Sequence, residues 1–497
     1  MQACLRSRII LILIQTTVRE GWGIGSLVRE RYHGDPRALE RRTSFYDLSP
    51  LPPSVWLFSS IWRMKLAVVG SGIAGLGAAW RLHRTHDVTV YEADSLPGGI
   101  SRTVEVDGAA VGADRETLAV DTGFVAFNEP SCPRLTALLV ELGVETQPVE
   151  ASFSVMLDGG HREYSGHLGG VLAQPGRPFD TRFLRMLRDM VRFRRKAGAL
   201  AREMRGSQSS IREVLTARGY SDAFLDDYLL PLGAAVRFAP LREVAATPAA
   251  AFIESLVGLG VLGLGDHLQW CSIGGGSRTY VDLMTAPLGK QLRLKTPVVA
   301  VERDTDGARV RDEGGGSERY DGVIIATRAD QALAMLGAGA TDEERALLGA
   351  FRYTDCTALL HTDQRFMPRR RRIWANWNCH ACPQGQDGEL PMLTCWMNRL
   401  HNIATDIPLF VTRNPAESPG AQQMLGQFTQ AYPILDTAAR RAQSALGEIQ
   451  GRRVWFCGAY CGLGSHEDAL VSGTTVAAQI ERAVEYGLLG PAVSAVA

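Results

Sequence analysis

Three glycines and one glutamate have the types and spacing of a site that binds nucleotide phosphates. Gly70, Gly72 and Gly75 form a G-x-G-x-x-G turn, and Glu92 follows it by roughly twenty residues. The first glycine allows a tight turn, the second lets the backbone approach a pyrophosphate, and the third lets a helix pack closely on a strand. A carboxylate at the position of Glu92 accepts a hydrogen bond from a ribose hydroxyl. These residues predict that the chain binds a dinucleotide.

The elements needed to position these residues are also predicted by the sequence. Residues 65–69 predict a buried strand, residues 73–84 have helical spacing, and residues 88–91 predict a second strand that ends at Glu92. The start of the helix would offer free N–H groups and the positive end of its dipole to the phosphates. A lone glycine turn is also compatible with an ordinary tight turn. The strand, helix and acid together favour nucleotide binding.

Composition narrows the class of protein. A chain of 497 residues has room for two or three domains. With 45% hydrophobic and 21% charged residues, it fits a soluble globular protein. The formal net charge is zero, so nothing global indicates a nucleic-acid partner. Only four residues are lysines, at positions 65, 196, 290 and 295.

The nine cysteines do not form a recognisable framework. Cys379 and Cys382 make a C-x-x-C, but no second pair stands at zinc spacing, so no metal site is expected. A redox pair is the alternative to two packed or loop thiols, and the packed interpretation is favoured. The expected location is the cytoplasm, where thiols stay reduced.

The first 63 residues differ in character from the rest. An apolar run at 9–14 follows Arg6 and Arg8, but it is shorter than a signal-peptide core and no A-x-A site follows. Met64 stands directly before the first strand of the nucleotide unit. Residues 1–63 are therefore expected to be a disordered extension or an over-long start assignment, with a cleaved targeting segment as the alternative.

The order of segments predicts a discontinuous nucleotide domain. Residues 64–145, 270–344 and 440–486 have its character, whereas 146–269 and 345–439 predict an inserted second domain, and 487–497 a flexible tail. Within the insertion, the glycine-rich apolar run at 249–264 is too short and too polar to span a membrane. It predicts a buried helix and loop beside an apolar cavity. The fold class is α/β, with a Rossmann-like domain and an inserted α+β domain.

This organisation resembles the flavoprotein amine-oxidase superfamily over nearly all of residues 64–485. Four motifs carry the resemblance: the Gly70 turn with Glu92, the Pro97–Gly98–Gly99 segment followed by Thr103, the Gly274–Gly275 segment with the Pro297–Val298 strand, and FCGAYCGLGSHEDALVSG at 456–473. The stretches DTGFVAFNEPSCPRLTALLVELGVET, LHTDQRFMP and CWMNRLHNI are similar to one subfamily. Its members are predicted FAD-binding oxidoreductases associated with cyclopropane-fatty-acid-synthase-like methyltransferases.

The resemblance implies FAD as the cofactor in a domain of the glutathione-reductase type. It places the pyrophosphate on the first glycine turn, the adenosine ribose on Glu92, the adenine on the backbone of Val298, and the flavin ring near Gly123 and Phe124. The terminal helix, predicted to start at residue 469, would direct N–H groups of its opening, near Asp468, Ala469 and Leu470, at the flavin. The implied cofactor-binding residues are Gly70, Gly72, Ile73, Ala74, Gly75, Glu92, Ala93, Gly98, Gly99, Arg102, Thr103, Gly123, Phe124, Val298, Gly458, Asp468, Ala469 and Leu470.

Two departures from the superfamily pattern concern side-chain contacts. Gly458 is followed by Ala459 where many members have an acid, and Gly98–Gly99 is followed by Ile100 where many have arginine. Backbone contacts to phosphate survive both changes. No second glycine motif with a strand and a helix is present, so reoxidation by oxygen, a quinone or another acceptor is expected rather than by NAD(P)H.

Candidate catalytic residues follow from the resemblance. Amine oxidases use a lysine near the flavin, and none of the four lysines lies in the corresponding segment; His361 lies there instead. His361 would act as an acid or base oriented by Asp363, or it is a hydrogen-bonded histidine at a strand end. Tyr460 and His466 are catalytic candidates because the terminal motif brings them near the ring.

Two further patterns concern the substrate. Aromatic and amide side chains recur over two strand-like segments and predict either a pocket or a sheet core, namely Trp374, Asn376, Trp377, Asn378, Trp396 and Asn398. Residues 183–195 alternate apolar residues with arginines. This helix would rest on an anionic membrane at the inner face or guide an acidic head group. The alternative, an ordinary surface helix with solvated arginines, is favoured.

Three hypotheses for function stay open. The first is an FAD-dependent oxidoreductase acting on a hydrophobic substrate, such as a fatty acyl chain of a membrane lipid. The second is an amine oxidase, which the missing lysine disfavours. The third is a flavin-binding partner subunit of a lipid methyltransferase.

Overall fold

The computed structural model describes residues 63–165, 180–237, 239–258, 269–380 and 390–490. The chain from Ile61 onward forms one compact unit. Several predictions fall on residues outside the described ranges, namely those for the first 62 residues, most of the C-terminal tail, Cys382 and residues 259–264. None of the described helices is long and apolar enough to cross a bilayer.

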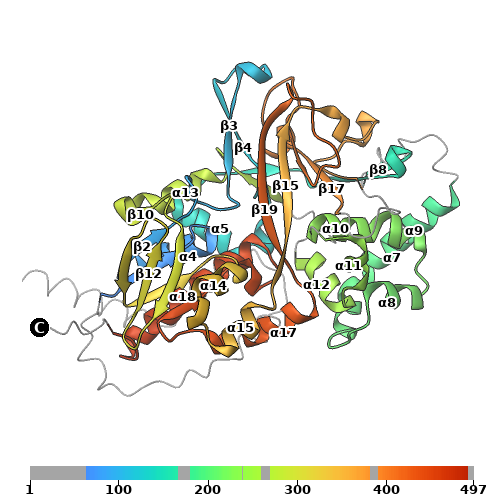
Figure 1. The fold of residues 1–497 in the computed structure, drawn as a ribbon. Coiled ribbons are helices and arrows are strands. Elements are labelled where there is room, and N and C mark those ends of the chain that lie inside the picture. Colours follow the sequence, from blue (N-terminus) through green and yellow to red (C-terminus); the bar gives the residue numbers. More distant parts are fainter. Residues whose placement is uncertain (1–62, 166–179, 238, 259–268, 381–389, 491–497) are drawn as a thin grey trace, which may run out of the picture. The chain divides into compact units, whose positions relative to one another are not determined.

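A five-stranded parallel sheet holds the glycine turn (Figure 1). Four of the five residues of its central strand β1 are buried, as expected for a parallel strand covered on both faces. In sheet order the strands are β10 (Leu292–Arg293), β2 (Asp87–Tyr91), β1 (Lys65–Val69), β14 (Gly322–Ile325) and β20 (Val454–Phe456).

Helices pack on one face of this sheet, and a strand meander with further helices packs on the other. The first face carries α4 (Ile73–Leu82), α5 (Pro133–Leu142), α13 (Arg278–Thr285) and α18 (His466–Glu485). The second carries β11 (Val298–Arg303), β12 (Ala308–Asp312), β13 (Ser317–Tyr320), α14 (Ala329–Leu336), α15 (Asp342–Leu348) and α17 (Thr437–Ala445).

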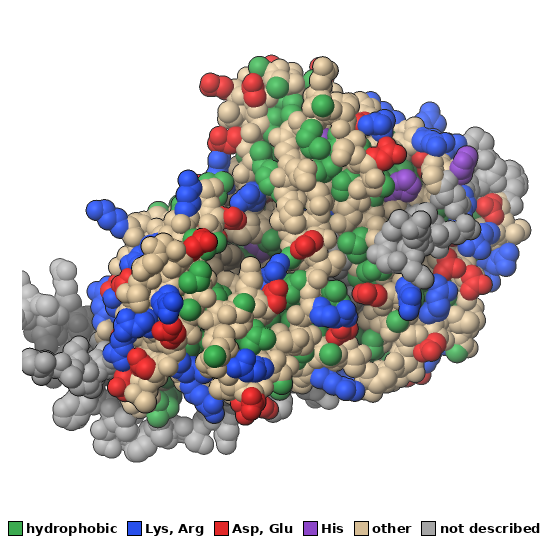
Figure 2. Space-filling model, in the orientation of Figure 1, with side chains coloured by type: hydrophobic (Ala, Val, Ile, Leu, Met, Phe, Trp, Pro, Cys, Tyr) green, Lys and Arg blue, Asp and Glu red, His purple; other side chains and the backbone are tan. Residues whose placement is uncertain are grey.

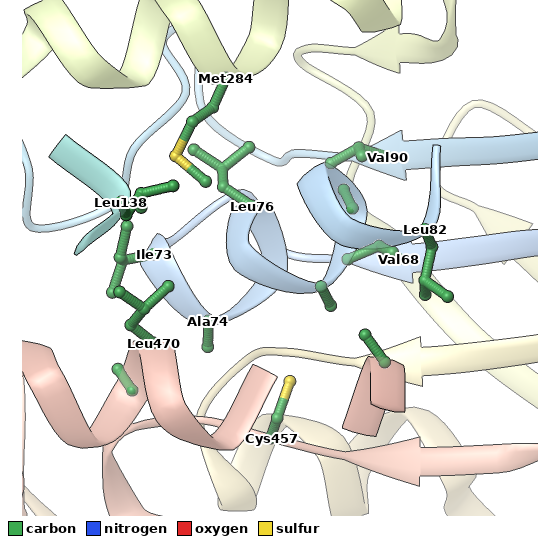
Figure 3. Close-up of a cluster of buried hydrophobic side chains, with 14 of the residues drawn as sticks. Val68, Ile73, Ala74, Leu76, Leu82, Val90, Leu138, Met284, Cys457 and Leu470 are labelled. Atoms are coloured by element: carbon green, nitrogen blue, oxygen red, sulfur yellow. The ribbon is translucent and has the colours of Figure 1, made fainter. Parts of the chain in front are cut away.

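The helix of the glycine turn is held by the terminal helix, as Figure 3 shows for Ile73, Ala74 and Leu470. A Cβ at Gly473 of α18 would lie 1.9 Å from the Ala74 carbonyl oxygen, and one at Gly77 would lie 2.7 Å from the Leu470 side chain. Glycine at these positions therefore lets α4 and α18 approach closely. The terminal helix, distant in the sequence, thus packs directly on the helix of the glycine turn.

A seven-stranded sheet makes up most of the remaining structure. Its order is β19 (Met424–Ile434), β15 (Arg352–His361), β18 (Phe410–Arg413), β17 (Met392–Trp396), β16 (Trp377–His380), β7 (Phe153–Leu157) and β8 (Arg162–Ser165). One apolar cluster joins this sheet to α7 (Thr181–Glu203), α8 (Ile211–Ala217), α9 (Asp222–Phe224), α10 (Leu230–Arg237), α11 (Leu241–Ala246) and α12 (Ala249–Gly258).

Smaller elements connect the two sheets. The hairpin of β3 (Thr103–Asp107) and β4 (Thr117–Asp121) packs in a cluster with residues of β15, β17 and β18. A three-stranded sheet joins β5 (Phe127–Asn128), β9 (Trp270–Ile273) and β6 (Thr146–Val149), and the short helix α16 (Met397–Leu400) follows β17.

The predicted α/β fold class with a parallel nucleotide-binding sheet is confirmed. The strands of the parallel sheet come from the three ranges predicted for the nucleotide domain, and those of the seven-stranded sheet come from the two inserted ranges. The division into domains itself stays a prediction. The terminal helix begins at His466, three residues before the predicted start at residue 469.

Candidate functional site

The glycine turn leaves open space beside Gly72. Gly70 has a φ of +100°, which only glycine adopts readily, and a Cβ at Gly75 would lie 1.9 Å from the Gly70 carbonyl oxygen. By contrast, no heavy atom lies within 4 Å of the position that a Cβ at Gly72 would take. The turn is therefore closely packed except on the side where a pyrophosphate is expected.

The start of α4 has donors for that group. Gly72 is the N-cap of the helix and has no side chain to bind the first N–H groups. Gly98 pairs with Gly72 in an isolated bridge, and its N–H donates to the Ser71 carbonyl at 3.0 Å. The two predicted glycine segments thus lie together, as a site for a pyrophosphate requires. The side chains of Ile73 and Ala74 are buried, so only their backbone can take part.

Glu92 is held at the end of β2. One oxygen of its carboxylate accepts from the Ser71 N–H at 2.9 Å and from the Ser71 hydroxyl at 2.5 Å, and the other accepts from the N–H of Asp94 at 2.9 Å. The Glu92 carbonyl accepts from Thr296, two residues before Val298. The residues predicted to bind ribose and adenine therefore lie on neighbouring segments, with Ala93 exposed beside them.

The predicted flavin end brings together three distant segments. The N–H of Phe124 donates to the Ile100 carbonyl at 3.1 Å, and a Cβ at Gly123 would lie 1.9 Å from that same oxygen. The ring of His466 stacks on Phe124 with centroids 4.0 Å apart. Gly99, Phe124 and the start of α18 are thereby placed around one region, as the sequence predicts.

His466 has a buried acceptor that no described residue binds. Its Nε2 lies 2.9 Å from the Tyr280 hydroxyl, which donates to Ser101 Oγ at 2.5 Å. With Tyr280 donating to Ser101, Nε2 carries the proton and Nδ1 has the lone pair. Nδ1 is buried and has no hydrogen-bond partner in the described part of the chain. An unpaired acceptor in this position fits a bound group that carries an N–H, as a flavin ring does.

Acidification should test the neutral state of His466. Burial lowers the pKa of His466 from its ordinary 6.5 to about 3. The stability that the neutral ring contributes is fully present above pH 6.5 and is lost as the pH falls toward 3, because the unfolded chain binds the proton first. When the pH is lowered from 7 to 5, we expect the unfolding free energy of His466→Gln to fall by about 2 kcal/mol less than that of the wild type.

Urea unfolding at the two pH values measures this difference. His83→Gln is the control, because the ring of His83 lies partly exposed at the end of α4. Equal losses in the wild type and His466→Gln would contradict the buried neutral state.

The terminal helix corrects one set of predicted contacts. The N–H of Asp468 binds the Ser465 hydroxyl at 3.1 Å and the N–H of Ala469 binds the Ser465 carbonyl at 3.1 Å, while Leu470 packs against α4. The N–H groups of Asp468 and Ala469 are therefore already bound within the helix, which disfavours them as donors to the flavin, and the side chain of Leu470 faces α4. The helix starts earlier than predicted, so the N–H groups of its first two residues, His466 and Glu467, are available instead.

Glu467 has a structural role that the sequence does not reveal. Its carboxylate accepts from the N–H groups of Arg134 and Leu135 at 2.7 and 2.9 Å. A side chain at the start of α18 therefore accepts hydrogen bonds from the otherwise unpaired N–H groups at the start of α5. This bond fixes α18 next to the segment that carries Phe124.

Tyr460 does not lie with His466. Its ring is 2% exposed and packs 5.0 Å from Phe351, within the cluster on the meander face of the parallel sheet. Ala469 and Leu470, which follow His466, belong to the cluster on the opposite face. This position disfavours the predicted catalytic role of Tyr460, which stays a prediction. Its hydroxyl is buried and has no hydrogen-bond partner among the described residues.

His361 finds its hydrogen-bond partners on its own and a neighbouring strand segment of the seven-stranded sheet. It is fully buried, its Nε2 lies 2.7 Å from Thr412 Oγ1, and its Nδ1 accepts from the Asp363 N–H at 3.1 Å. The Asp363 carboxylate instead pairs with Arg365 at 2.7 Å. These contacts lie inside the seven-stranded sheet, and they favour the hydrogen-bonded histidine at a strand end over the acid or base.

Three further residues predicted to bind the cofactor have hydrogen-bond or ion-pair partners within the protein. The Arg102 guanidinium pairs with Asp94 at 3.3 Å. The Thr103 hydroxyl donates to Asp121 and accepts from the N–H of Arg278 at 2.9 Å, so it holds α13 and its single donor is already used. The N–H of Gly458 donates to Ser472 at 2.9 Å.

Sequence reasoning missed a buried arginine behind the flavin end. Arg413 is 4% exposed and donates to the carbonyls of Thr122, at 3.4 Å, and Gly123. Gln430 is 9% exposed, and its amide nitrogen would lie 2.7 Å from a Cβ at Gly123. The available signal was a charged residue ending the apolar run that starts at Leu409.

A second missed arginine lies beside the terminal loop. Arg440 of α17 is partly buried, and its guanidinium donates to Gln443 at 3.4 Å. Gln443 in turn donates to the carbonyls of Tyr460 and Gly462 at 2.7 and 2.5 Å. Burial lowers the pKa of Arg440, and the nearby charges of Asp468 and Glu254 raise it. The described part of the chain provides no salt bridge to this guanidinium.

The aromatic and amide set divides into packing and pocket residues. Trp374 packs on Trp396 with centroids 5.2 Å apart, and Asn378 binds Ser154 and the Ala375 backbone. Asn376 and Asn398 line a pocket of about 440 Å³. That pocket includes none of the residues around Phe124 and His466.

The parallel sheet, the glycine turn and the oriented Glu92 carboxylate define a dinucleotide-binding α/β protein. Residues 73–400 match the family of flavin-containing amine oxidoreductases, and the chain belongs to this family. FAD is the typical cofactor of the family. The finer assignment to a methyltransferase-associated subfamily stays a prediction.

Relatives of known name agree with the family. AofH of Mycobacterium tuberculosis, by name a flavin-containing monoamine oxidase, is 26% identical over 274 residues, which are 52% of this chain and 55% of that protein. The chain thus spans about half the length of the curated relatives it matches.

Solved structures show the same fold. Putrescine oxidase bound to putrescine has a TM-score of 0.60 at 16% identity, covering 84% of this chain and 99% of that one. Cyclohexylamine oxidase from Brevibacterium oxydans has a TM-score of 0.60 at 17% identity, covering 85% and 100%. A fatty acid isomerase from P. acnes that produces CLA has a TM-score of 0.59 at 13% identity, covering 84% and 98%.

Proposed function

We propose that this enzyme oxidises a hydrophobic substrate with an anionic head group, such as a fatty acid or an acyl chain of an anionic lipid. Arg440 carries the proposal. Its guanidinium is partly buried next to the terminal loop and binds no carboxylate among the described residues. A charge in that setting attracts an anion and repels the ammonium group of an amine.

The positions of the lysines support this choice over an amine oxidase. Lys65 pairs with Glu318 at 2.7 Å at the start of β1, and Lys196 is exposed on α7. Lys290 and Lys295 flank β10 at the edge of the parallel sheet. None of them belongs to the group around Phe124 and His466. The named relatives include both amine oxidases and a fatty acid isomerase, so they allow either substrate class.

The protein's own residues would bind and orient the reactants. The open side of Gly72 and the start of α4 would hold the pyrophosphate, Glu92 would bind the ribose, and the stacked rings of Phe124 and His466 would exclude water from the flavin end. When bound, FAD supplies the acceptor for the hydride that the substrate loses. Arg440 would hold the head group so that the apolar chain enters the site in one direction.

Replacing Arg440 tests the proposal. We expect Arg440→Ala to raise the dissociation constant of decanoate for the FAD-loaded enzyme by about 10-fold or more, because a charge-assisted hydrogen bond is lost. The perturbation of the flavin absorbance spectrum reports binding. Arg441→Ala is a matched control, since Arg441 is exposed on the same helix. Equal affinities in all three proteins would refute the role of Arg440.

The partner-subunit hypothesis makes a different prediction for the same preparation. In a flavin-binding subunit without its own turnover, neither acyl chains nor amines would reduce the flavin. Such a subunit would bind a lipid methyltransferase tightly.

A further inference from the structure

The helix α7 concentrates positive charge in a chain whose formal net charge is zero. Its residues Thr181–Glu203 include eight arginines and lysines but only two acids. On the face drawn in Figure 2, by contrast, basic and acidic side chains are interspersed. The helix is therefore an exception to the charge distribution of the molecule.

Few of these cations are neutralised. Arg182 pairs with Asp227 and Arg188 pairs with Asp189, both at 2.9 Å. The acid at the end of the helix, Glu203, pairs with an arginine of another element, Arg218. The remaining basic residues of α7 have no ion pair in the described part of the chain, namely Arg185, Arg192, Arg194, Arg195, Lys196 and Arg202.

The exposed face of α7 also carries apolar side chains. Leu184 is 47% exposed and Val191 is 38% exposed. Their spacing of seven residues puts them on one side of the helix, and Arg195 and Arg202 continue the same row at intervals of four and seven. This row carries two apolar side chains followed by two cations, all in contact with solvent.

The opposite face of α7 is buried, so only some of its apolar residues could contact a membrane as the sequence pattern suggests. Phe183, Met186 and Phe193 are buried against the seven-stranded sheet and its helices. They are therefore core residues and unavailable to a membrane. Leu184 and Val191, which the sequence pattern does not distinguish from them, are the exposed ones.

We propose that this face of α7, defined by Leu184, Val191, Arg195 and Arg202, docks on the surface of an anionic phospholipid bilayer. Cations near the surface bind lipid phosphates, and the two apolar side chains enter the boundary between head groups and acyl chains. The apolar side chains favour a bilayer over a nucleic acid, whose backbone offers only phosphates. The proposal goes beyond the proposed function, because this surface binds lipid whatever the flavin oxidises.

Vesicle sedimentation tests the docking surface. We expect the FAD-loaded full chain to bind vesicles that contain phosphatidylcholine and phosphatidylglycerol, with weaker binding at high salt. Binding to phosphatidylcholine alone should be at least about 10-fold weaker. R195E/R202E and L184S/V191S should each weaken binding to the anionic vesicles by about 10-fold or more.

The control is R115E/R309E, which reverses two exposed arginines outside α7. Flavin content and thermal unfolding midpoint should be equal in all variants, because none of the changed side chains lies in the core. Absence of wild-type binding to anionic vesicles overturns the proposal, and so does unchanged binding of R195E/R202E. Binding to duplex DNA that the same variants abolish, without vesicle binding, would identify a nucleic-acid surface and also overturn it.

Discussion

Gly72→Asp should give a folded protein that does not bind FAD. The φ of Gly72 is −62° and ψ is 171°, a conformation open to any residue, and a Cβ there meets no heavy atom within 4 Å. The new carboxylate would occupy the space expected for the pyrophosphate and repel its charge. At an N-cap, aspartate also accepts a hydrogen bond from the helix, so the apoprotein should gain a few tenths of a kcal/mol.

Gly75→Ala is the matched control for this prediction. A Cβ at residue 75 would lie 1.9 Å from the Gly70 carbonyl oxygen, so the turn must open and the unfolding free energy should fall by more than about 2 kcal/mol. Urea unfolding of the apoproteins separates the two effects, and equilibrium dialysis with FAD measures binding. A Gly72→Asp protein that retains FAD with wild-type affinity would contradict the assigned phosphate site.

Arg413→Met should cause the second large effect, a loss of about 2–5 kcal/mol of unfolding free energy. The guanidinium is buried and donates to the carbonyls of Thr122 and Gly123, which would lose these donors. The Gly123–Phe124 segment would then be less ordered, and FAD affinity should fall with it. Arg413 thus acts as a positioning residue.

Arg413→Lys distinguishes positioning from charge alone. Lysine retains the positive charge but lacks the planar set of donors, so we expect an intermediate loss of stability and affinity. Arg309→Met, at an exposed strand position, is the control for removing an arginine. Chemical denaturation of the four proteins measures the differences. A loss below about 1 kcal/mol for Arg413→Met would refute the positioning role.

The region around the glycine turn is the part of the fold that the sequence predicts best. Strand, turn, helix and acid are consecutive, so local spacing alone predicts β1, α4, β2 and the site at Gly72 and Glu92. The sequence also indicates in part which distant segments pack together, because the terminal motif contains Gly473, which packs against Ala74 of α4.

The candidate site residues were harder to assign for a physical reason. Tyr460 and His466 are six positions apart in one motif, yet the turn between β20 and α18 sends them to opposite faces of the parallel sheet. His361 has the residue type of an acid or base, but its surroundings, Thr412 and Phe410, come from another strand of the sheet. Arg413 donates to the distant Gly123 carbonyl, and Arg440 contacts Gln443, which in turn binds the Tyr460 carbonyl, so no local pattern marks either arginine.

The substrate class is tested most directly by flavin reduction under anaerobic conditions with two ligands of equal chain length and opposite charge. The FAD-loaded wild type is mixed with decanoate or with decylamine, and the loss of oxidised-flavin absorbance is followed by stopped flow. We expect reduction by the acid, slowed by Arg440→Ala, and none by the amine. Rapid reduction by decylamine, with decanoate inert, would contradict it.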